Sequence, residues 1–202
     1  MTITSSQKKS ASPLAGLFAS SSRETMLRVF LLDPHRAYYQ RQLESATGLP
    51  IRAIQREVER LTTVGLLYRR TEGNRTYYQA DPDFPCYPEL RGMVIKTATP
   101  LEAFRAELAV HPEVRLAFLD SHNAQALVVG KTGAMSASES LSSPVPVRWV
   151  SSESFVDALA NAAPDWADVL NEGTDVLGRR DDPIWRRIEA AGYQVKKGKG
   201  VP

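Results

Sequence analysis

The sequence is poor in the residues that form disulfides and metal centres. Its 202 residues include one cysteine, Cys86, and three scattered histidines, His35, His111 and His122. A single thiol cannot close an internal disulfide, and this set is too small for the cysteine-rich sites of metal-sensing repressors. We therefore expect neither a metal nor any other cofactor.

Long apolar runs are also absent. No stretch approaches the ~18 to 20 apolar residues that a helix needs to span a bilayer. Residues 1–12 form a polar segment rich in serine, threonine and lysine, without the apolar core of a signal peptide. We therefore expect a cytoplasmic protein that has no contact with membranes.

Lysine is missing from residues 21–80, which hold ten arginines against six acidic residues and carry a net charge of +4. Residues 81–202 hold thirteen basic and seventeen acidic residues, a net charge of −4. Because phosphate neutralisation supplies most non-specific affinity for nucleic acid, this asymmetry predicts that only the first part contacts it. The alternative is a module that dimerises or binds protein, with its arginines as a solvated face.

Residues 50–64 have the pattern of an amphipathic helix. Apolar side chains recur at helical spacing at Ile51, Ile54, Val58 and Leu61. The opposite side carries Arg52, Gln55, Arg56 and Glu59. Arginine and glutamine suit phosphate oxygens and the guanine and adenine edges of a major groove. The segment is therefore predicted to pack one face against a core and to present the other to DNA.

Two helices and a hairpin are expected around this segment. Ser22 can cap a helix over residues 23–32, and Gly48 can end a second helix over residues 40–47. Residues 66–71 and 75–79 read as strands around the turn Glu72-Gly73-Asn74. Three helices followed by a hairpin is the plan of a winged helix-turn-helix domain.

The sequence over residues 20–80 resembles the ArsR/MarR-type bacterial transcription regulators. The resemblance is carried by Leu43, Gly48, the run Arg56-Glu57-Val58-Glu59-Arg60-Leu61, Gly65-Leu66-Leu67 and Gly73-Asn74-Arg75-Thr76-Tyr77-Tyr78. In those families the second helix of the motif enters the major groove and the wing touches the backbone or minor groove. By matching position, these are residues 50–64 and 69–77. The DNA-binding residues that we expect are Arg41, Arg52, Gln55, Arg56, Arg60, Arg69, Arg70, Asn74 and Arg75.

The rest of the chain is expected to form a second, smaller domain. A proline-rich link leads into helices over residues 89–97 and 100–110, which either extend the winged helix into a dimer or belong to the second core. Strands follow at residues 114–119, 126–129 and 145–150, with helices at 152–162, 165–170 and 183–191. The expected divisions are a disordered segment (1–20), a winged helix (21–80), connecting helices (81–112), an α/β domain (113–195) and a disordered basic tail (196–202).

The second domain resembles, more faintly, the minimal nucleotidyltransferase domains that sometimes follow a winged helix. In that family a strand leads into a Gly-Ser turn, and a second strand bears an Asp-x-Asp pair that holds a divalent metal. Here Asp120-Ser121 stands at the turn, and Asn123 and Gln125 stand where the two acids belong. Neutral amides cannot supply the charge that a Mg²⁺–triphosphate centre uses. The resemblance therefore implies a degenerate, noncatalytic domain kept for ligand sensing, dimerisation or partner binding.

Two other signals resemble enzyme motifs. Gly130-Lys131-Thr132 is similar to the end of a phosphate-binding loop, but Gln125 stands where that motif needs a glycine, so we expect a simple turn. Asp120, Ser121 and His122 are the residue types of a hydrolytic triad. Neighbours in an extended segment point to opposite faces, so we expect no relay among them.

These observations predict an α+β protein that is a sequence-specific transcription regulator and not an enzyme. Its expected partners are double-stranded DNA, a second copy of the chain on a pseudo-palindromic operator, and an unknown small-molecule effector or protein. An unrelated small α/β domain is an alternative for the second part. Two further alternatives concern the whole protein. One is a protein-interaction scaffold; the other is a nucleotidyltransferase or toxin-antitoxin component with metal ligands at Asp120, Asp157 or Asp175.

Overall fold

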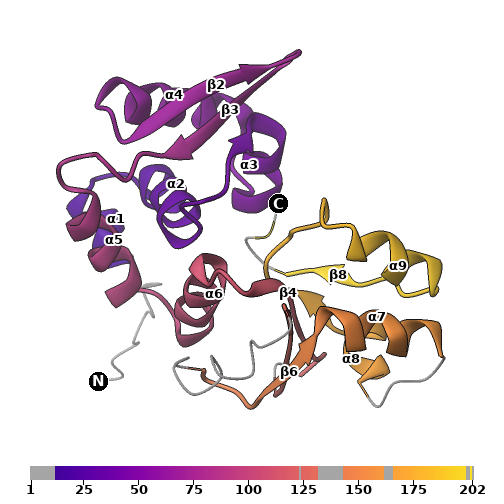
Figure 1. The fold of residues 1–202 in the computed structure, drawn as a ribbon. Coiled ribbons are helices and arrows are strands. Elements are labelled where there is room, and N and C mark those ends of the chain that lie inside the picture. The colour runs from indigo at the N-terminus through magenta and orange to yellow at the C-terminus, as the bar shows by residue number, and fades with distance from the viewer. Residues whose placement is uncertain (1–11, 123, 132–142, 162–165, 199–200, 202) are drawn as a thin grey trace, which may run out of the picture.

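The computed structural model describes residues 12–122, 124–131, 143–161, 166–198 and 201. Over these residues the chain is an α+β protein with nine helices and two β-sheets. Figure 1 shows the smaller sheet and its helices in an N-terminal half, the larger sheet and its helices in a C-terminal half, and α6 between them. Within the same ranges, no helix combines the length and apolar character needed to cross a membrane.

The N-terminal half combines short helices with a three-stranded antiparallel sheet of order β1-β3-β2. Its helices are α1 (Pro13–Leu17), α2 (Ser21–Leu32), α3 (Gln40–Thr47), α4 (Ile51–Thr63) and α5 (Tyr87–Lys96). Its strands are β1 (Tyr38–Tyr39), β2 (Leu67–Glu72) and β3 (Arg75–Ala80). The hairpin turn contains Gly73, whose φ of 56° lies in the left-handed region that glycine adopts without strain.

Helix α2 begins earlier than the sequence suggested. Ser20, not Ser22, is the N-cap: its backbone is extended, and its Oγ accepts a hydrogen bond from the Arg23 backbone N–H at 3.2 Å. Three consecutive serines can each act as a cap, so local sequence did not decide between them. Helix α3 has the predicted bounds, and it ends at Gly48, which has a φ of 67°.

One hydrophobic core joins all five helices of the N-terminal half to the small sheet. Leu14 of α1 and Val94 of α5 are buried in this core beside the apolar residues of α2, α3 and α4. The prediction of a disordered segment over residues 1–20 is therefore wrong for α1, while residues 1–11 lie outside the described ranges. Helix α5 is likewise part of the N-terminal core rather than a connection between domains, because burial of Val94 requires its contact with that core.

Helix α6 (Pro100–Val110) contributes to both halves. Ala106 belongs to the N-terminal core, whereas Phe104, Leu108 and Ala109 belong to a core on one face of the large sheet. A capping box fixes its start: Thr99 Oγ1 accepts from the Glu102 backbone N–H, and Glu102 accepts from the Thr99 backbone N–H. The helix therefore holds the two halves together within one chain.

The large sheet is mixed, with the order β6-β5-β4-β7-β8. Its strands are β4 (Val114–Leu119), β5 (Ala126–Gly130), β6 (Val147–Ser151), β7 (Thr174–Asp175) and β8 (Lys196–Lys197). The pairs β5–β6 and β7–β8 are parallel, and β4 is antiparallel to both of its neighbours. The associated helices are α7 (Ser152–Ala160), α8 (Ala167–Asn171) and α9 (Ile184–Ala190).

Alternation along β4 and β5 divides the C-terminal half into two cores. Leu116 and Phe118 face the core formed with α7, α8 and α9, while Ala117 and Leu119 face the core formed with α6. Both faces of these strands are covered, which explains why they read as continuous apolar runs. The three predicted strands of this half are present, with β6 shifted toward the C-terminus.

The described residues of the basic tail, 196–198 and 201, are ordered where disorder was expected. Lys196 and Lys197 form β8, parallel to β7, and the Gly198 backbone N–H donates to the Asp175 carbonyl at 3.0 Å. Val201 is buried. Both lysine side chains remain exposed, so only backbone groups pair β8 with β7. The charged composition of the tail therefore gave no indication of a strand.

Candidate nucleic-acid interface

Every residue that the sequence assigned to DNA binding is exposed, and together they lie on two helices and the hairpin. Arg41 is on α3, and α4 carries Arg52, Gln55, Arg56 and Arg60. The hairpin carries Arg69 and Arg70 on β2, Asn74 in the turn and Arg75 on β3. Exposure leaves all of these side chains open to a partner.

The α4 residues form one continuous outer surface. Arg52, Gln55 and Arg56 occupy its first two turns, and Gln55 Nε2 lies 3.5 Å from Gln40 Oε1 at the start of α3. Ile51 was expected in the apolar stripe but is 37% exposed, because it is the first residue of the helix and lies at the edge of the buried face. The buried face consists instead of Ile54, Val58 and Leu61, together with a carboxylate, Glu57.

Glu57 is 1% exposed and is surrounded by guanidinium groups. Arg23 Nε of α2 lies 3.2 Å from its Oε2, while Arg56 Nε and Arg60 Nη1 lie 3.7 and 3.8 Å from its Oε1. The Arg56 and Arg60 side chains remain 64% and 51% exposed. The buried carboxylate therefore anchors α4 to α2 and holds two outward arginines close to the helix. Sequence reasoning missed this role, although Glu57 lies three residues after Ile54 and four before Leu61, which is the spacing of the buried face.

The two faces of the hairpin carry different arginines. Arg69 pairs with Tyr78 across the hairpin, and Arg70 pairs with Tyr77, so the two arginines point to opposite faces. Tyr78 belongs to the same core as Ile54 of α4, which places Arg69 on the face that packs toward α4. The expected wing residues are thus divided between two surfaces.

Arg70 and Arg75 stand among aromatic rings on the other face. The Arg70 guanidinium lies over the Tyr77 ring at 5.8 Å, and the Arg75 guanidinium lies over the Tyr39 ring at 4.8 Å. The two rings meet edge to face, with centroids 5.7 Å apart. Such stacking restrains the guanidinium planes while their N–H edges stay available. Sequence reasoning missed these aromatic contacts. The tyrosine pairs Tyr38-Tyr39 and Tyr77-Tyr78 were the feature of the sequence that could have indicated them.

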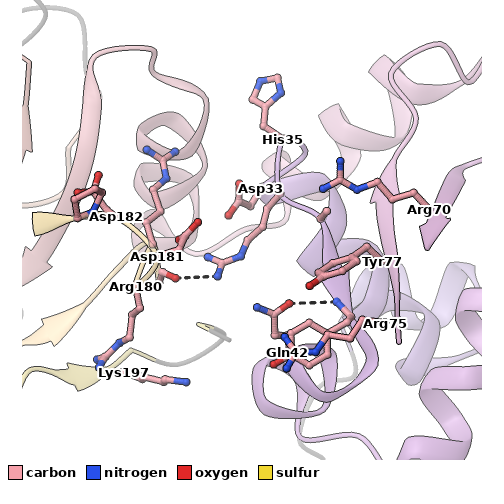
Figure 2. Close-up of a pocket in the computed structure, with 16 residues that line it drawn as sticks. Asp33, His35, Gln42, Arg70, Arg75, Tyr77, Arg180, Asp181, Asp182 and Lys197 are labelled. Carbon is pink, nitrogen blue, oxygen red and sulfur yellow. Dashed lines mark hydrogen bonds between the residues drawn. The ribbon is translucent and has the colours of Figure 1, made fainter. Parts of the chain in front are cut away.

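This face of the hairpin borders a cleft of about 820 Å³ between the two halves. Figure 2 shows Arg70, Arg75 and Tyr77 on one side, and Arg180, Asp181 and Lys197 on the other. Of the expected DNA-binding residues within the described ranges, Arg70 and Arg75 line the cleft, whereas Arg69 and those of α4 do not. The structure therefore separates the predicted site into an α4 surface and a cleft surface.

Three further arginines of the cleft donate hydrogen bonds to backbone carbonyls. Arg36 donates from Nη1 to the Leu177 carbonyl at 2.7 Å and from Nη2 to the Gly178 carbonyl at 2.8 Å, which ties the two halves. Arg179 donates to the Val114 and Ala109 carbonyls at 2.5 and 2.7 Å. Arg180 donates to the Val195 carbonyl at 2.7 Å and lies over the Trp185 ring at 4.4 Å. These contacts give the three arginines structural roles.

The acidic residues of the cleft are largely compensated or buried. Asp182 receives two hydrogen bonds from Arg115, at 2.9 and 2.7 Å. Burial raises the pKa of Asp33, and the nearby Arg36, Arg105 and Arg179 offset this effect only in part. Asp175 of β7 does not line the cleft; burial raises its pKa as well, although the Gly178 backbone N–H donates to its carboxylate. Asp181 is exposed.

The Asp33 carboxyl predicts a specific pH dependence of stability. The pKa of Asp33 in the folded state lies above its ordinary value in the unfolded chain, so between these two pKa values the folded state binds more protons than the unfolded state. The free energy of unfolding is therefore expected to fall as pH rises through this window. Asp33→Asn should flatten the fall in urea unfolding measured from about pH 4 to about pH 8, whereas Asp181→Asn at an exposed position should not. Superimposable pH profiles for wild type and Asp33→Asn would contradict this.

The nucleotidyltransferase-like positions lie at the turn between β4 and β5. Asp120 Oδ1 accepts from the Ala124 backbone N–H at 2.7 Å, and the Asp120 backbone N–H donates to the Gln125 carbonyl at 3.1 Å. Asn123 lies outside the described ranges. Over the described residues there is no cluster of three or more histidine, cysteine, aspartate or glutamate side chains that could hold a metal ion.

The expectation that residues 120–122 form an extended segment is wrong. Ser121 Oγ and His122 Nδ1 lie 3.0 Å apart, because the residues sit in a turn rather than in an extended strand. Both are exposed, and the described contact of the Asp120 carboxylate is with a backbone amide.

Gly130 ends β5 and the Lys131 backbone N–H donates to the Glu113 carbonyl at 2.9 Å, while Thr132 lies outside the described ranges.

Comparison of the chain with known protein families, with curated proteins and with solved structures finds no match in any of the three.

Proposed function

We propose that the protein is a sequence-specific DNA-binding transcription regulator whose N-terminal half is a winged helix-turn-helix domain. The order α2, β1, α3, α4, β2, β3, with a β1-β3-β2 sheet, supports this assignment. In such a domain α4 is the helix that enters the major groove, and the β2–β3 hairpin is the wing. The surface charge of the N-terminal half agrees with a nucleic-acid partner.

The observation that carries the proposal is the exposure of Arg52, Gln55 and Arg56 on the first two turns of α4. The N-terminal residues of a recognition helix are those that reach base edges. Arginine pairs bidentately with guanine and glutamine with adenine. Packing of Ile54 and Val58 into the core fixes the rotation of α4, so these three side chains face outward together.

We propose that the C-terminal half senses a ligand or dimerises, without catalysis. The neutral side chain of Gln125 supports this, because it precedes β5 at a position where the resembled enzymes carry an acid. A homodimer would place two α4 helices on half-sites about one helical turn of DNA apart.

The test is selection of DNA fragments by the purified full chain, followed by footprinting. The proposal predicts enrichment of one sequence, protection of two related half-sites, and an affinity that falls linearly with salt on logarithmic axes, with a slope of about −0.9 per neutralised phosphate. No enrichment, or binding that is independent of salt, would contradict it.

A matched pair of substitutions compares the contributions of the two faces of the wing to DNA binding. We expect Arg69→Ala to weaken binding similarly for all DNA sequences and to reduce the salt slope by about one, because Arg69 shares the face on which α4 packs. Arg70→Ala removes the same charge from the neighbouring residue on the cleft face and should have a smaller effect. Titration of labelled DNA at several salt concentrations measures both. Equal losses in the two variants would rule out this division of the wing.

A further inference from the structure

The cleft between the wing and the C-terminal half combines three features that the DNA-binding proposal does not use. Its cleft-facing arginines, Arg70 and Arg75, are stacked on tyrosine rings. Lys197 approaches from β8 on the opposite side (Figure 2). Its volume of about 820 Å³ lies within the range of small-molecule sites.

The charges in this cleft favour an anion. The Lys197 side chain is exposed and has no ion pair or hydrogen bond among the described residues. Arg70 has one acidic partner, Glu72 at 3.3 Å, and both side chains are more than half exposed, so water or a stronger anion can replace this contact at little cost. Of the acids, Asp182 is held by Arg115 and burial raises the pKa of Asp33, leaving Asp181 as the exposed carboxylate.

The arrangement of the cations selects among anions. A guanidinium that lies over a ring directs its N–H groups outward in one plane, which suits two oxygens of the same phosphate. Arg75 is held in this way on the wing, and Lys197 supplies a compact charge from the other half. A ligand that meets both must present negative charge at more than one point.

We propose that this cleft binds a phosphorylated small molecule through Arg75 and Arg70 of the wing and Lys197 of β8. The site is distinct from the β4–β5 turn, where the nucleotidyltransferase resemblance would place its metal. The phosphates can belong to a nucleotide or to an inorganic polyphosphate, since both offer the chemistry that these side chains recognise. Because the proposal concerns a different surface from α4, its test requires no DNA.

The experiment is calorimetric titration of the full chain with inorganic triphosphate, ATP, GTP and adenosine. At least one phosphate-bearing compound is expected to bind and adenosine is not; comparison of triphosphate with the nucleotides identifies which source is preferred. Arg75→Ala and Lys197→Ala should each weaken binding about tenfold or more, as expected for loss of a charged hydrogen bond. Circular dichroism checks that each variant is folded.

Two controls match these variants closely. Lys196→Ala removes the neighbouring charge of β8, and Arg69→Ala removes a charge from the opposite face of the wing; neither residue lines the cleft. Both should change the dissociation constant by less than about twofold, because screened surface charges contribute little. The proposal is overturned if no phosphate-bearing compound binds at millimolar concentration, if the controls weaken binding as much as the cleft variants, or if duplex DNA alone binds through Arg75 and Lys197.

Discussion

Arg52→Ala and Arg56→Ala are each expected to weaken operator binding by about 1 to 3 kcal/mol, the range for loss of a base-reading contact. Both side chains are exposed on the outer face of α4, while the opposite face is held in the core by Ile54 and Val58. Neither substitution removes buried apolar surface, so the fold should remain intact. Fluorescence anisotropy with the selected operator measures the effect.

The two arginines are not expected to be equivalent. Arg56 Nε lies 3.7 Å from Glu57 Oε1, whereas Arg52 has no ion pair within the described part of the chain. Moving Arg56 onto DNA must weaken its attraction to Glu57, so Arg52→Ala should cause the larger loss. Arg187→Ala, an exposed helical arginine of the C-terminal half, is the control and should leave operator affinity unchanged. Full affinity in both α4 variants would remove this helix from the interface.

Arg23→Ala is expected to lower the free energy of unfolding by about 3 kcal/mol, the lower end of the range for breaking a buried ion pair. The substitution leaves the Glu57 carboxylate, 1% exposed, without its closest cation at 3.2 Å. It also removes the hydrogen bond from Arg23 Nη1 to the Phe18 carbonyl. Arg56 and Arg60 stay within 4 Å of the carboxylate and limit the loss. Urea unfolding of wild type and variant gives the difference.

The double variant Arg23→Ala/Glu57→Gln distinguishes this cause from lost packing. Glutamine has nearly the same shape as glutamate and carries no charge, so the double variant should recover part of the stability lost in Arg23→Ala. If the double variant is less stable than Arg23→Ala, the buried charge is not the source of the loss.

The sequence predicted local elements well, because their signals lie within a few residues. Helix α3 has the expected bounds, ended by Gly48, and the hairpin turns around Gly73 as expected. The continuous apolar runs of β4 and β5 likewise predicted strands that are buried on both faces. In each case, the spacing of apolar residues and a glycine or proline at the boundary were sufficient to predict the element.

Elements that depend on distant partners were missed. Strands β7 and β8 have two residues each, which is too short for an alternating pattern of apolar residues to be recognised. They pair in parallel although about twenty residues separate them in the sequence. The place of α5 in the N-terminal core was also unexpected, because a proline-rich link before a helix does not reveal which core the helix joins.

The candidate site could be predicted only in part. Alternation along β2 already implies that Arg69 and Arg70 face opposite ways. Which face meets the C-terminal half is decided by long-range contacts, including those from Arg36 to the Leu177 and Gly178 carbonyls. The position of Lys197 opposite the wing across the cleft depends on the same packing, and no local sequence pattern encodes it.

Base reading by α4 is tested by the affinity of wild type and Arg52→Ala for a set of operators, each changed at a single base pair. We predict that wild type discriminates at every position of the half-site, and that Arg52→Ala loses discrimination at one position while keeping the others. A variant that binds every operator more weakly by the same factor would show that Arg52 touches only phosphate, and a variant indistinguishable from wild type would contradict the account of α4.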